Sequence, residues 1–277
     1  MGYKKYGEIF RKVREQRNYS LADFQTIGIS KASLSKFERG KTTMSFERVN
    51  EALQLMNIGL EEYENFLNDY LPNLSEEILV AIYNANMLGK ENIVREFYEF
   101  TSHDDLYFVG LAAKSCYETL NEEEIENLTE LFYSINIWSY SELCILYFTF
   151  SQLNEKDAFY IVKKLLNEKH AVFNSRKYSE LVVQIFCKSI FVFSYKGYYK
   201  NAKYIVDKVE SHSFVNMMFL NNLYNFCHGY FIFCFKDRER GYEELKIALD
   251  IFNYIGTKEM SVFYQREYER YIAPKLG

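Results

Sequence analysis

The sequence contains very little proline. Pro72 and Pro274 are the only two prolines, and none lies between them. Proline interrupts helices because it lacks a backbone N–H donor and clashes with the preceding turn. Its absence over so long a stretch, together with only 12 glycines, argues against a strand-rich fold with many tight turns. The sequence therefore predicts an all-α protein of long helices joined by short polar breaks.

Cysteines and long apolar runs are also scarce. The five cysteines are odd in number, far apart and embedded in apolar segments, so we expect reduced, buried thiols rather than a disulfide framework or a zinc site. No stretch approaches the roughly 18 uncharged apolar residues of a membrane span, and the N-terminus lacks the apolar core of a signal peptide. A cytoplasmic protein is expected.

Catalytic motifs are missing as well. The sequence has no glycine-rich phosphate loop, no nucleophile elbow and no metal-spaced set of His, Cys, Asp and Glu. His228 lies beside Cys227, but adjacent residues on a helix diverge by about 100° and would not converge on one metal ion. We therefore expect no enzyme activity, no metal and no cofactor.

Charge is unevenly distributed along the chain, whose net charge is −5. Residues 1–58, the head, carry 11 Lys and Arg against six Asp and Glu, a charge of +5. The remaining residues, the body, carry 22 against 32, a charge of −10. A basic head is attracted to phosphate and an acidic body is repelled by it. The head therefore predicts nucleic-acid binding, and the body predicts a different kind of partner.

Residues 28–41, with the sequence GISKASLSKFERGK, have the features of a DNA-recognition helix. Gly28 can adopt the left-handed turn conformation, Ser30 can cap the helix that follows, and Gly40 can end it. Leu34 lies on an apolar face, whereas the opposite face is small and basic. Such a face fits the major groove, where lysine can donate to the acceptors of guanine.

The first 70 residues divide into five short predicted helices. Ser20 and Ser45 can cap the second and the fourth, and Gly59 precedes the fifth. After a break that contains Pro72, Ser75 can cap the next helix. The predicted helices cover residues 6–16, 21–26, 31–38, 46–56 and 60–70. The sequence thus predicts a DNA-binding domain at 1–70, a linker at 71–75 and a helical repeat domain at 76–277.

The head resembles the helix-turn-helix of phage-repressor-like regulators, the XRE type. The resemblance rests on VREQR at 13–17, on Ser20, on GIS at 28–30, on LSKFERGK at 34–41 and on the apolar fourth helix. In that family the arginine at the position of Arg14 pairs with the glutamate at the position of Glu38, which implies a structural ion pair. The resemblance also implies a DNA-binding set, with bases read by Lys31, Ala32 and Lys36, phosphates bound by Ser20, Arg39, Lys41 and Thr42, and Ser30 and Ser33 on the same surface.

The head departs from that pattern in two places. The spacing between Ser20 and Gly28 is one residue short, and Leu21 stands where the family commonly has a glutamine that touches phosphate. Ala32 supplies no hydrogen bond, so few groups read the bases and each half-site has modest specificity. We therefore expect a dimer on a two-fold operator. The alternative is a basic face that meets RNA or an acidic protein.

After Pro72 the chain repeats a helix, a short polar turn and a second helix about five times, at periods of roughly 30–45 residues. One such unit cannot bury its apolar face alone, so we expect the units to stack into a right-handed α-solenoid with a concave inner face. The second helices of the last two units resemble tetratricopeptide repeats; the alternative is an irregular helical bundle. The predicted pairs are 76–88 with 91–101, 104–119 with 122–134, 139–153 with 155–169, 177–195 with 198–211 and 214–235 with 239–254, followed by a last helix at 258–272.

The head, its LSKFERG run, a length near 280 residues and an aromatic-rich helical body together resemble the Rgg (Rgg/GadR/MutR) family of regulators. That resemblance implies a homodimeric, cytoplasmic transcription factor of quorum sensing in Gram-positive bacteria, whose repeat domain binds a short imported hydrophobic peptide pheromone. Some members join their dimer through a cysteine near the end of the head. This head has no cysteine, so such a covalent dimer is not expected.

The body is rich in side chains suited to peptide binding, since the chain contains 25 Tyr and 24 Phe. Tyrosine offers a large contact area with a polar tip. Peptide amides also need polar partners, because an unpaired buried amide costs about 1–3 kcal/mol. We expect these partners on the first helices of the later repeats, with Lys188 placed to meet a carboxylate and the asparagines at 221, 222 and 225 on one side of their helix. The candidates are Tyr147, Gln152, Gln184, Lys188, Phe191, Asn221, Asn222 and Asn225, and for each the alternative is an ordinary place on a helix surface or between helices.

These observations predict a DNA-binding transcriptional regulator controlled by a peptide. Peptide binding would change the curvature or dimer packing of the repeat domain and thereby the spacing of the two heads on DNA. The alternative is a constitutive helix-turn-helix regulator whose repeat domain is a protein–protein scaffold or a small-molecule sensor.

Overall fold

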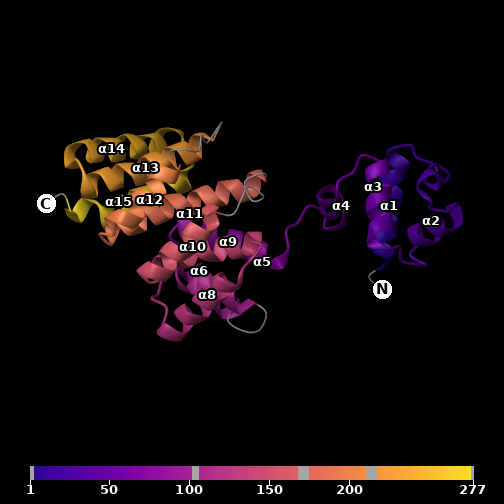
Figure 1. Cartoon of the computed structure of the whole chain (residues 1–277), viewed down its shortest axis with the longest axis horizontal. Coiled ribbons are helices and arrows are strands. Elements are labelled where there is room, and N and C mark those ends of the chain that lie inside the picture. The colour runs from indigo at the N-terminus through magenta and orange to yellow at the C-terminus, as the bar shows by residue number, and fades with distance from the viewer. Residues whose placement is uncertain (1–2, 102–105, 168–174, 210–216, 276–277) are drawn as a thin grey trace. The chain divides into compact units, whose positions relative to one another are not determined.

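The computed structural model describes residues 3–101, 106–167, 175–209 and 217–275, and every regular element in these ranges is helical (Figure 1). The chain divides into two compact units, Met1–Asn73 and Leu74–Gly277. Within the described ranges, no helix is long and apolar enough to cross a membrane.

Residues 3–73 of the first unit form four α-helices and one 3-10 turn. They are α1 (Tyr3–Gln16), η1 (Asp23–Ile27), α2 (Lys31–Glu38), α3 (Phe46–Leu55) and α4 (Leu60–Leu67). Phe10 of α1 is fully buried, and its ring centroid lies 5.8, 5.6 and 6.4 Å from those of Phe24, Phe37 and Tyr63. One aromatic side chain thus connects α1 to η1, α2 and α4.

The second element is shorter than the predicted helix at 21–26. The Oγ of Ser20 accepts a hydrogen bond from the N–H of Ala22 at 3.2 Å, and the carboxylate of Asp23 accepts one from the N–H of Ser20 at 2.6 Å. Such local bonds compete with the helical pattern, so the segment forms only the 3-10 turn η1. Ser20 therefore does not cap a helix.

Other predicted helix starts have mixed outcomes. Ser30 caps α2, because its Oγ accepts from the N–H of Ser33 at 3.2 Å. Ser45 occupies the N-cap position of α3, but its side chain makes no capping hydrogen bond to the backbone of that helix. The first helix of the second unit, α5, begins at Leu74, so Ser75 lies inside its first turn rather than at its cap.

The second unit is a stack of helix pairs, as expected. The pairs are α5 (Leu74–Met87) with α6 (Glu91–Thr101), α7 (Tyr107–Lys114) with α8 (Glu122–Ser134), α9 (Tyr140–Thr149) with α10 (Glu155–Asn167), α11 (Arg176–Tyr195) with α12 (Tyr199–Val209), and α13 (Met218–Phe235) with α14 (Arg238–Ile255), followed by α15 (Lys258–Tyr271). The helix starts predicted at 104 and 214 and the ends predicted at 169 and 211 lie outside the described residues.

Two first helices end earlier than predicted. α7 ends at Lys114, whose ammonium binds both carboxylate oxygens of Glu124, at 2.8 and 3.0 Å. Glu124 also forms the capping box with Asn121 that starts α8, so the intervening residues must turn. α9 ends at Thr149 and continues as the 3-10 turn η3 (Phe150–Gln152).

The first helices of the pairs form the inner layer of the stack. α5 contacts α7, α7 contacts α9, α9 contacts α11, and α11 contacts α13. The last helix, α15, contacts both α14 and α5. It therefore lies across the inner layer, from the final pair back to the first.

Small residues and aromatic rings hold the C-terminal helices together. A Cβ added at Gly241 would lie 2.2 Å from the nitrogen of Phe233, so glycine permits α13 and α14 to cross closely. On the neighbouring face, Phe252 of α14 stacks on Tyr264 of α15, with ring centroids 4.0 Å apart and planes 9° apart. This stack anchors α15 to the final pair.

Candidate nucleic-acid interface and ligand cavity

α2 presents a small, basic face to solvent. Leu34 is fully buried and Phe37 is 5% exposed, so these two side chains fix α2 on the core of the first unit. The opposite side carries Lys31, Ala32 and Lys36, all of them exposed. Of the other residues predicted to contact DNA, Ser20, Ser30, Arg39, Lys41 and Thr42 are exposed, and Ser33 is half-buried.

Glycines with left-handed backbone lie at both ends of α2. Gly28 has a φ of 77° and Gly40 a φ of 64°, a conformation that L side chains rarely adopt. After α2, the N–H of Lys41 donates to the carbonyl of Lys36 at 2.8 Å. Gly40 also lies against α1, where a Cβ would meet the Cα of Lys4 at 2.7 Å. The recognition helix is thus a single short element with sharply defined ends.

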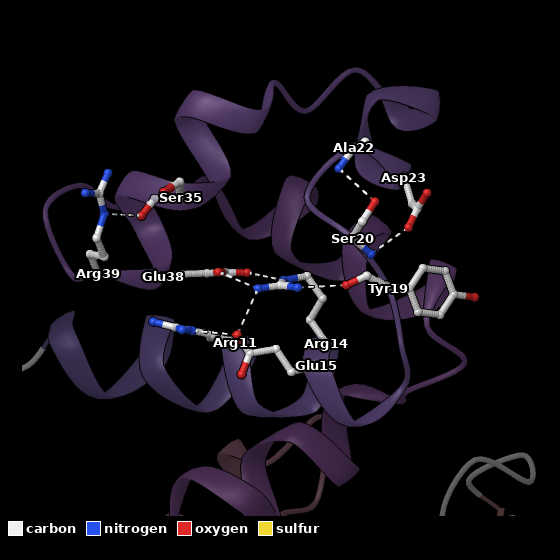
Figure 2. Close-up of polar contacts among 10 residues, drawn as sticks. All are labelled: Arg11, Arg14, Glu15, Tyr19, Ser20, Ala22, Asp23, Ser35, Glu38 and Arg39. Carbon is white, nitrogen blue, oxygen red and sulfur yellow. Dashed lines mark hydrogen bonds and ion pairs between the residues drawn. The ribbon is translucent and has the colours of Figure 1, made fainter.

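A buried ion pair holds α2 on α1 (Figure 2). The Nε of Arg14 lies 2.6 Å from Oε1 of Glu38, and a terminal nitrogen lies 3.0 Å from Oε2. Another terminal nitrogen of Arg14 donates to the carbonyl of Tyr19 at 2.7 Å. Arg14 is 7% and Glu38 4% exposed, and their hydrogen bonds raise the pKa of Arg14. The pair fixes the C-terminal end of α2 and the loop that leads to η1.

Two arginines near this pair, Arg11 and Arg39, form their hydrogen bonds on the exposed surface. Arg11 donates to Glu15 at 2.8 Å on the surface of α1, and Arg39 donates to the carbonyl of Ser35 at 3.0 Å (Figure 2). The second contact keeps the guanidinium of Arg39 beside the recognition helix and leaves its remaining N–H groups available for phosphate.

A cavity of about 470 Å³ lies in the second unit, between the inner helices and α15. That volume falls within the roughly 300–1,000 Å³ of typical ligand pockets. Its apolar lining includes Phe191 of α11, Leu223 and Phe226 of α13, and Tyr264 and Tyr271 of α15. The cavity thus combines side chains from helices that are distant in sequence.

Four of the predicted peptide-binding residues line this cavity: Tyr147, Gln184, Lys188 and Phe191. The ammonium of Lys188 donates to the carbonyl of Tyr147 and, at 3.3 Å, to that of Phe148. It also lies 4.5 Å from the ring centroid of Tyr147. Burial lowers the pKa of Lys188 to about 8.

The other four predicted residues lie elsewhere. Gln152 donates to the carbonyl of Glu118 at 3.2 Å. Asn222 is 4% exposed and donates to the carbonyl of Ala248 at 2.9 Å, which places it between α13 and α14. Asn221 and Asn225 are exposed on α13. The expectation of one shared asparagine side is wrong, because a step of one residue rotates a helical side chain by about 100°.

Sequence reasoning missed the residues that α15 contributes, because it treated this helix as a cap of the array. Arg266, Glu267 and Arg270 all line the cavity. Arg266 donates to the carbonyl of Asn86 at 2.9 Å and so connects α15 to the end of α5. Four of the five residues 266–270 are charged, so no signal along the chain singled out Glu267.

Nothing in the described residues suggests a metal centre. They contain no group of three or more His, Cys, Asp and Glu placed to hold a metal ion, and all five cysteines are free. The Nδ1 of His228 lies 3.1 Å from a carboxylate oxygen of Glu244, and its ring stacks on that of Tyr224. This histidine packs between helices.

Two regions of the chain match known protein families. Residues 10–63 match the helix-turn-helix family, and residues 90–266 match the family described as the C-terminal domain of the HTH-type transcriptional regulator Rgg. The first region contains α2 and the Arg14–Glu38 pair. The second contains most of the cavity.

Solved structures of other proteins share the fold. The SHP pheromone receptor Rgg2 of Streptococcus dysgalactiae is 20% identical, with a TM-score of 0.77 over 96% of this chain and 99% of the receptor. A protein of Listeria monocytogenes EGD-e described as a transcriptional regulator is 14% identical, with a TM-score of 0.78 over 99% of both chains. PrgX in its complex with cCF10 is 13% identical, with a TM-score of 0.67 over 96% of this chain and 99% of PrgX.

The match to the Rgg C-terminal domain covers more than half of the chain, and the head before it has the buried ion pair and exposed basic helix of a helix-turn-helix. The chain belongs to the Rgg family of helix-turn-helix transcriptional regulators.

Proposed function

We propose that this regulator binds promoter DNA as a homodimer and that a short hydrophobic signalling peptide, held in the cavity of its repeat domain, controls that binding. The observation that carries the proposal is the presence in one chain of an exposed basic recognition helix and a cavity of about 470 Å³, lined in part by aromatic rings, with α15 as one wall. Such a protein acts in the cytoplasm, where the DNA is, and carries out no catalysis.

The chemistry of α2 supports dimeric DNA binding. Lys31 and Lys36 are the long donors on its outer face, and Ala32 between them offers only apolar contact. A good bidentate base contact gives about 1–3 kcal/mol of discrimination. Two such helices are therefore needed for a specific site, and the phosphate contacts of Ser20, Arg39, Lys41 and Thr42 would fix each helix in its groove.

The lining of the cavity supports a peptide ligand. Aromatic walls suit apolar side chains, and Gln184 offers both a donor and an acceptor to a peptide backbone. The similar structures include a pheromone receptor and PrgX bound to cCF10. The proposed peptide contacts are Tyr147, Gln184, Lys188 and Phe191; Gln152 and the three asparagines lie outside the cavity and are not used.

Control would act through α15. This helix contacts α14 and α5 and forms one wall of the cavity, so a ligand that touches both α15 and the inner helices favours one arrangement of the repeat domain. A difference in ligand affinity between two arrangements is what couples two sites. In the dimer, that difference would alter the spacing of the two heads.

The test uses the full-length protein in two steps. Selection from randomised DNA duplexes is expected to enrich a two-fold symmetric site. The affinity for that site is then measured with and without a pool of synthetic hydrophobic peptides, and a change of at least 5-fold is expected, at the lower end of typical coupling. Failure to enrich any sequence would contradict DNA recognition. An unchanged affinity in the presence of peptides that bind would favour the constitutive alternative.

A further inference from the structure

We infer that Glu267 of α15 binds an ammonium group of the ligand, so that the cavity selects a peptide by its positively charged end. This inference rests on the proposed peptide binding and adds the chemical group that the cavity recognises. The group can be the α-ammonium of the peptide or the side chain of a lysine.

Glu267 is a carboxylate with unused acceptor capacity inside the cavity. It lines the cavity on the same helix as Tyr264 and Tyr271. Among the described residues, its carboxylate has no hydrogen-bond or ion-pair partner, and only the longer-range charges of Lys188, Arg266 and Arg270 act on it. Burial raises the pKa of Glu267 in spite of these three cations. A desolvated carboxylate of this kind gains most from a donor that enters with the ligand.

Three of the four cations that line the cavity already donate to backbone carbonyls. Lys188 donates to the carbonyls of two residues at the end of α9. Lys196 donates to those of Ser151 and Leu153, at 2.9 and 3.4 Å, beside η3. Arg266 donates to the end of α5. These side chains satisfy carbonyls that a helix end leaves without partners.

The remaining charges leave Glu267 as the open acceptor. Glu91 is paired with Arg95, whose nitrogen lies 2.7 Å from its carboxylate. Arg270 is exposed and lies over the ring of Tyr271, 5.2 Å from its centroid. Of the two carboxylates that line the cavity, Glu267 is therefore the one without a partner among the described residues, whereas Arg270, a cation that no carbonyl holds, is exposed to solvent.

The aromatic lining favours the same ligand group. Tyr147, Phe226, Tyr264 and Tyr271 all line the cavity. The faces of aromatic rings attract cations, by about 0.5–1 kcal/mol at exposed sites and about 2 kcal/mol when desolvated. An ammonium group beside Glu267 can thus meet a carboxylate and an aromatic face together. A ligand carboxylate would meet Arg270 and only those N–H groups of Lys188, Lys196 and Arg266 that the carbonyls leave unused.

Recognition by Glu267 would also couple ligand binding to the position of α15. Glu267 and Arg266 are adjacent on this helix, and Arg266 connects it to Asn86 of α5. A ligand bonded to Glu267 and packed against α11 and α13 therefore contacts both sides of the cavity. Binding of the ammonium group would therefore stabilise the arrangement of α15 that is adopted with the ligand.

The experiment measures retention of a synthetic pool of apolar hexapeptides by the full-length protein. The pool contains no Lys, Arg or His and is prepared in four forms, with a free or acetylated N-terminus and a free or amidated C-terminus. Peptides that co-elute with the protein in size exclusion are quantified by mass spectrometry. Forms with a free N-terminus are expected to be retained at least 10-fold more than acetylated forms. A fifth, acetylated pool with one lysine per peptide tests whether a side-chain ammonium serves instead.

Glu267→Gln is expected to abolish the preference, because the amide keeps the shape and loses the charge. Glu269→Gln is the matched control, since Glu269 is an exposed acid on the same helix. Thermal unfolding of both variants checks that each is folded.

Retention that is equal with and without acetylation, with no gain from lysine, would overturn the inference and leave peptide binding intact. Dependence on the C-terminal carboxylate alone would overturn the inference and assign the anchor to the cations of the cavity. Retention of no pool in any form would count against the proposed function as well.

Discussion

Arg14 binds Glu38 through two hydrogen bonds, of 2.6 and 3.0 Å, in a part of the head where both side chains are buried. A third bond, to the carbonyl of Tyr19, uses another face of the same guanidinium. The pair therefore joins α1, the end of α2 and the loop before η1. Each charge is acceptable there only because the other is present.

Arg14→Ala is expected to lower the local stability of the head by about 3–5 kcal/mol, because it leaves the carboxylate of Glu38 buried without a partner. Hydrogen exchange of the α1 and α2 amides in the full-length protein measures this loss. Arg11→Ala is the control, since Arg11 pairs with Glu15 on the exposed surface of α1 and should leave protection unchanged. Equal effects of the two substitutions would show that burial of the pair is not what stabilises α2.

Gly7 tests how closely α1 approaches α2. Its backbone is helical, and Gly to Ala in an open helical site usually stabilises by about 0.4–1 kcal/mol. A Cβ at Gly7 would, however, lie 2.0 Å from the carbonyl oxygen of Phe37. Gly7→Ala is therefore expected to destabilise the head, as measured by thermal unfolding. Gly59→Ala, where a Cβ meets nothing within 4 Å, should be close to neutral. A stabilised Gly7→Ala protein would contradict this packing.

Binding experiments should distinguish the residues of the head that contact bases from those that contact phosphates. Lys31→Ala or Lys36→Ala is expected to cost about 1–3 kcal/mol of binding and to relax the sequence preference at one position. Lys41→Ala should weaken binding to all sequences alike and reduce the salt slope by about 1. Lys200→Ala, an exposed lysine of the repeat domain, is the control. Gel shifts on the selected site and its single-base variants, over a range of salt, distinguish these outcomes.

The order of helices could be predicted from the sequence because it depends on local signals. Apolar spacing, few prolines and the cap at Ser30 are all readable along the chain. What could not be predicted depends on partners far apart in sequence. Arg266 and Asn86 are 180 positions apart, and their hydrogen bond places α15 across the inner layer. The cavity residues of that helix were therefore missed, whereas Lys188 on an inner helix was found.

The asparagine at 222 was assigned to a ligand, but its amide bridges two helices. Asn222 donates to the carbonyl of Ala248 at 2.9 Å, and its own Oδ1 is buried without a hydrogen bond. Asn222→Ala removes this interhelical hydrogen bond, so we expect a loss of about 0.5–1.5 kcal/mol in the unfolding free energy of the repeat domain. Asn225→Ala, at an exposed site on the same helix, should have no such effect. Urea unfolding followed by far-UV circular dichroism measures both. A stable Asn222→Ala protein that loses peptide binding would restore the ligand role.

Buried thiols should make the repeat domain sensitive to alkaline pH. Burial raises the pKa of Cys144 to about 12, well above the 8.5 or so of an exposed thiol. Between these values the unfolded thiol ionises and the folded one does not, so the unfolded state binds fewer protons. Stability conferred by the protonated thiol is therefore complete below about pH 8.5 and is lost as pH rises toward 12.

Cys144→Ala should make the unfolding free energy fall less steeply with pH above 9, by up to about 1.4 kcal/mol per pH unit. The volume removed by the substitution lowers stability equally at every pH, so only the slope reports the thiol. Cys234→Ala provides the comparison. Cys234 is half-buried, and the charge of Lys275 opposes the effect of burial on its pKa, so its slope should change less. The contradicting outcome is that the unfolding free energy of both variants falls with pH as steeply as that of the parent protein between pH 9 and 10.5. The thiol of Cys144 would then have to reach water in the folded protein, and the close packing of α9 against its neighbours would be wrong.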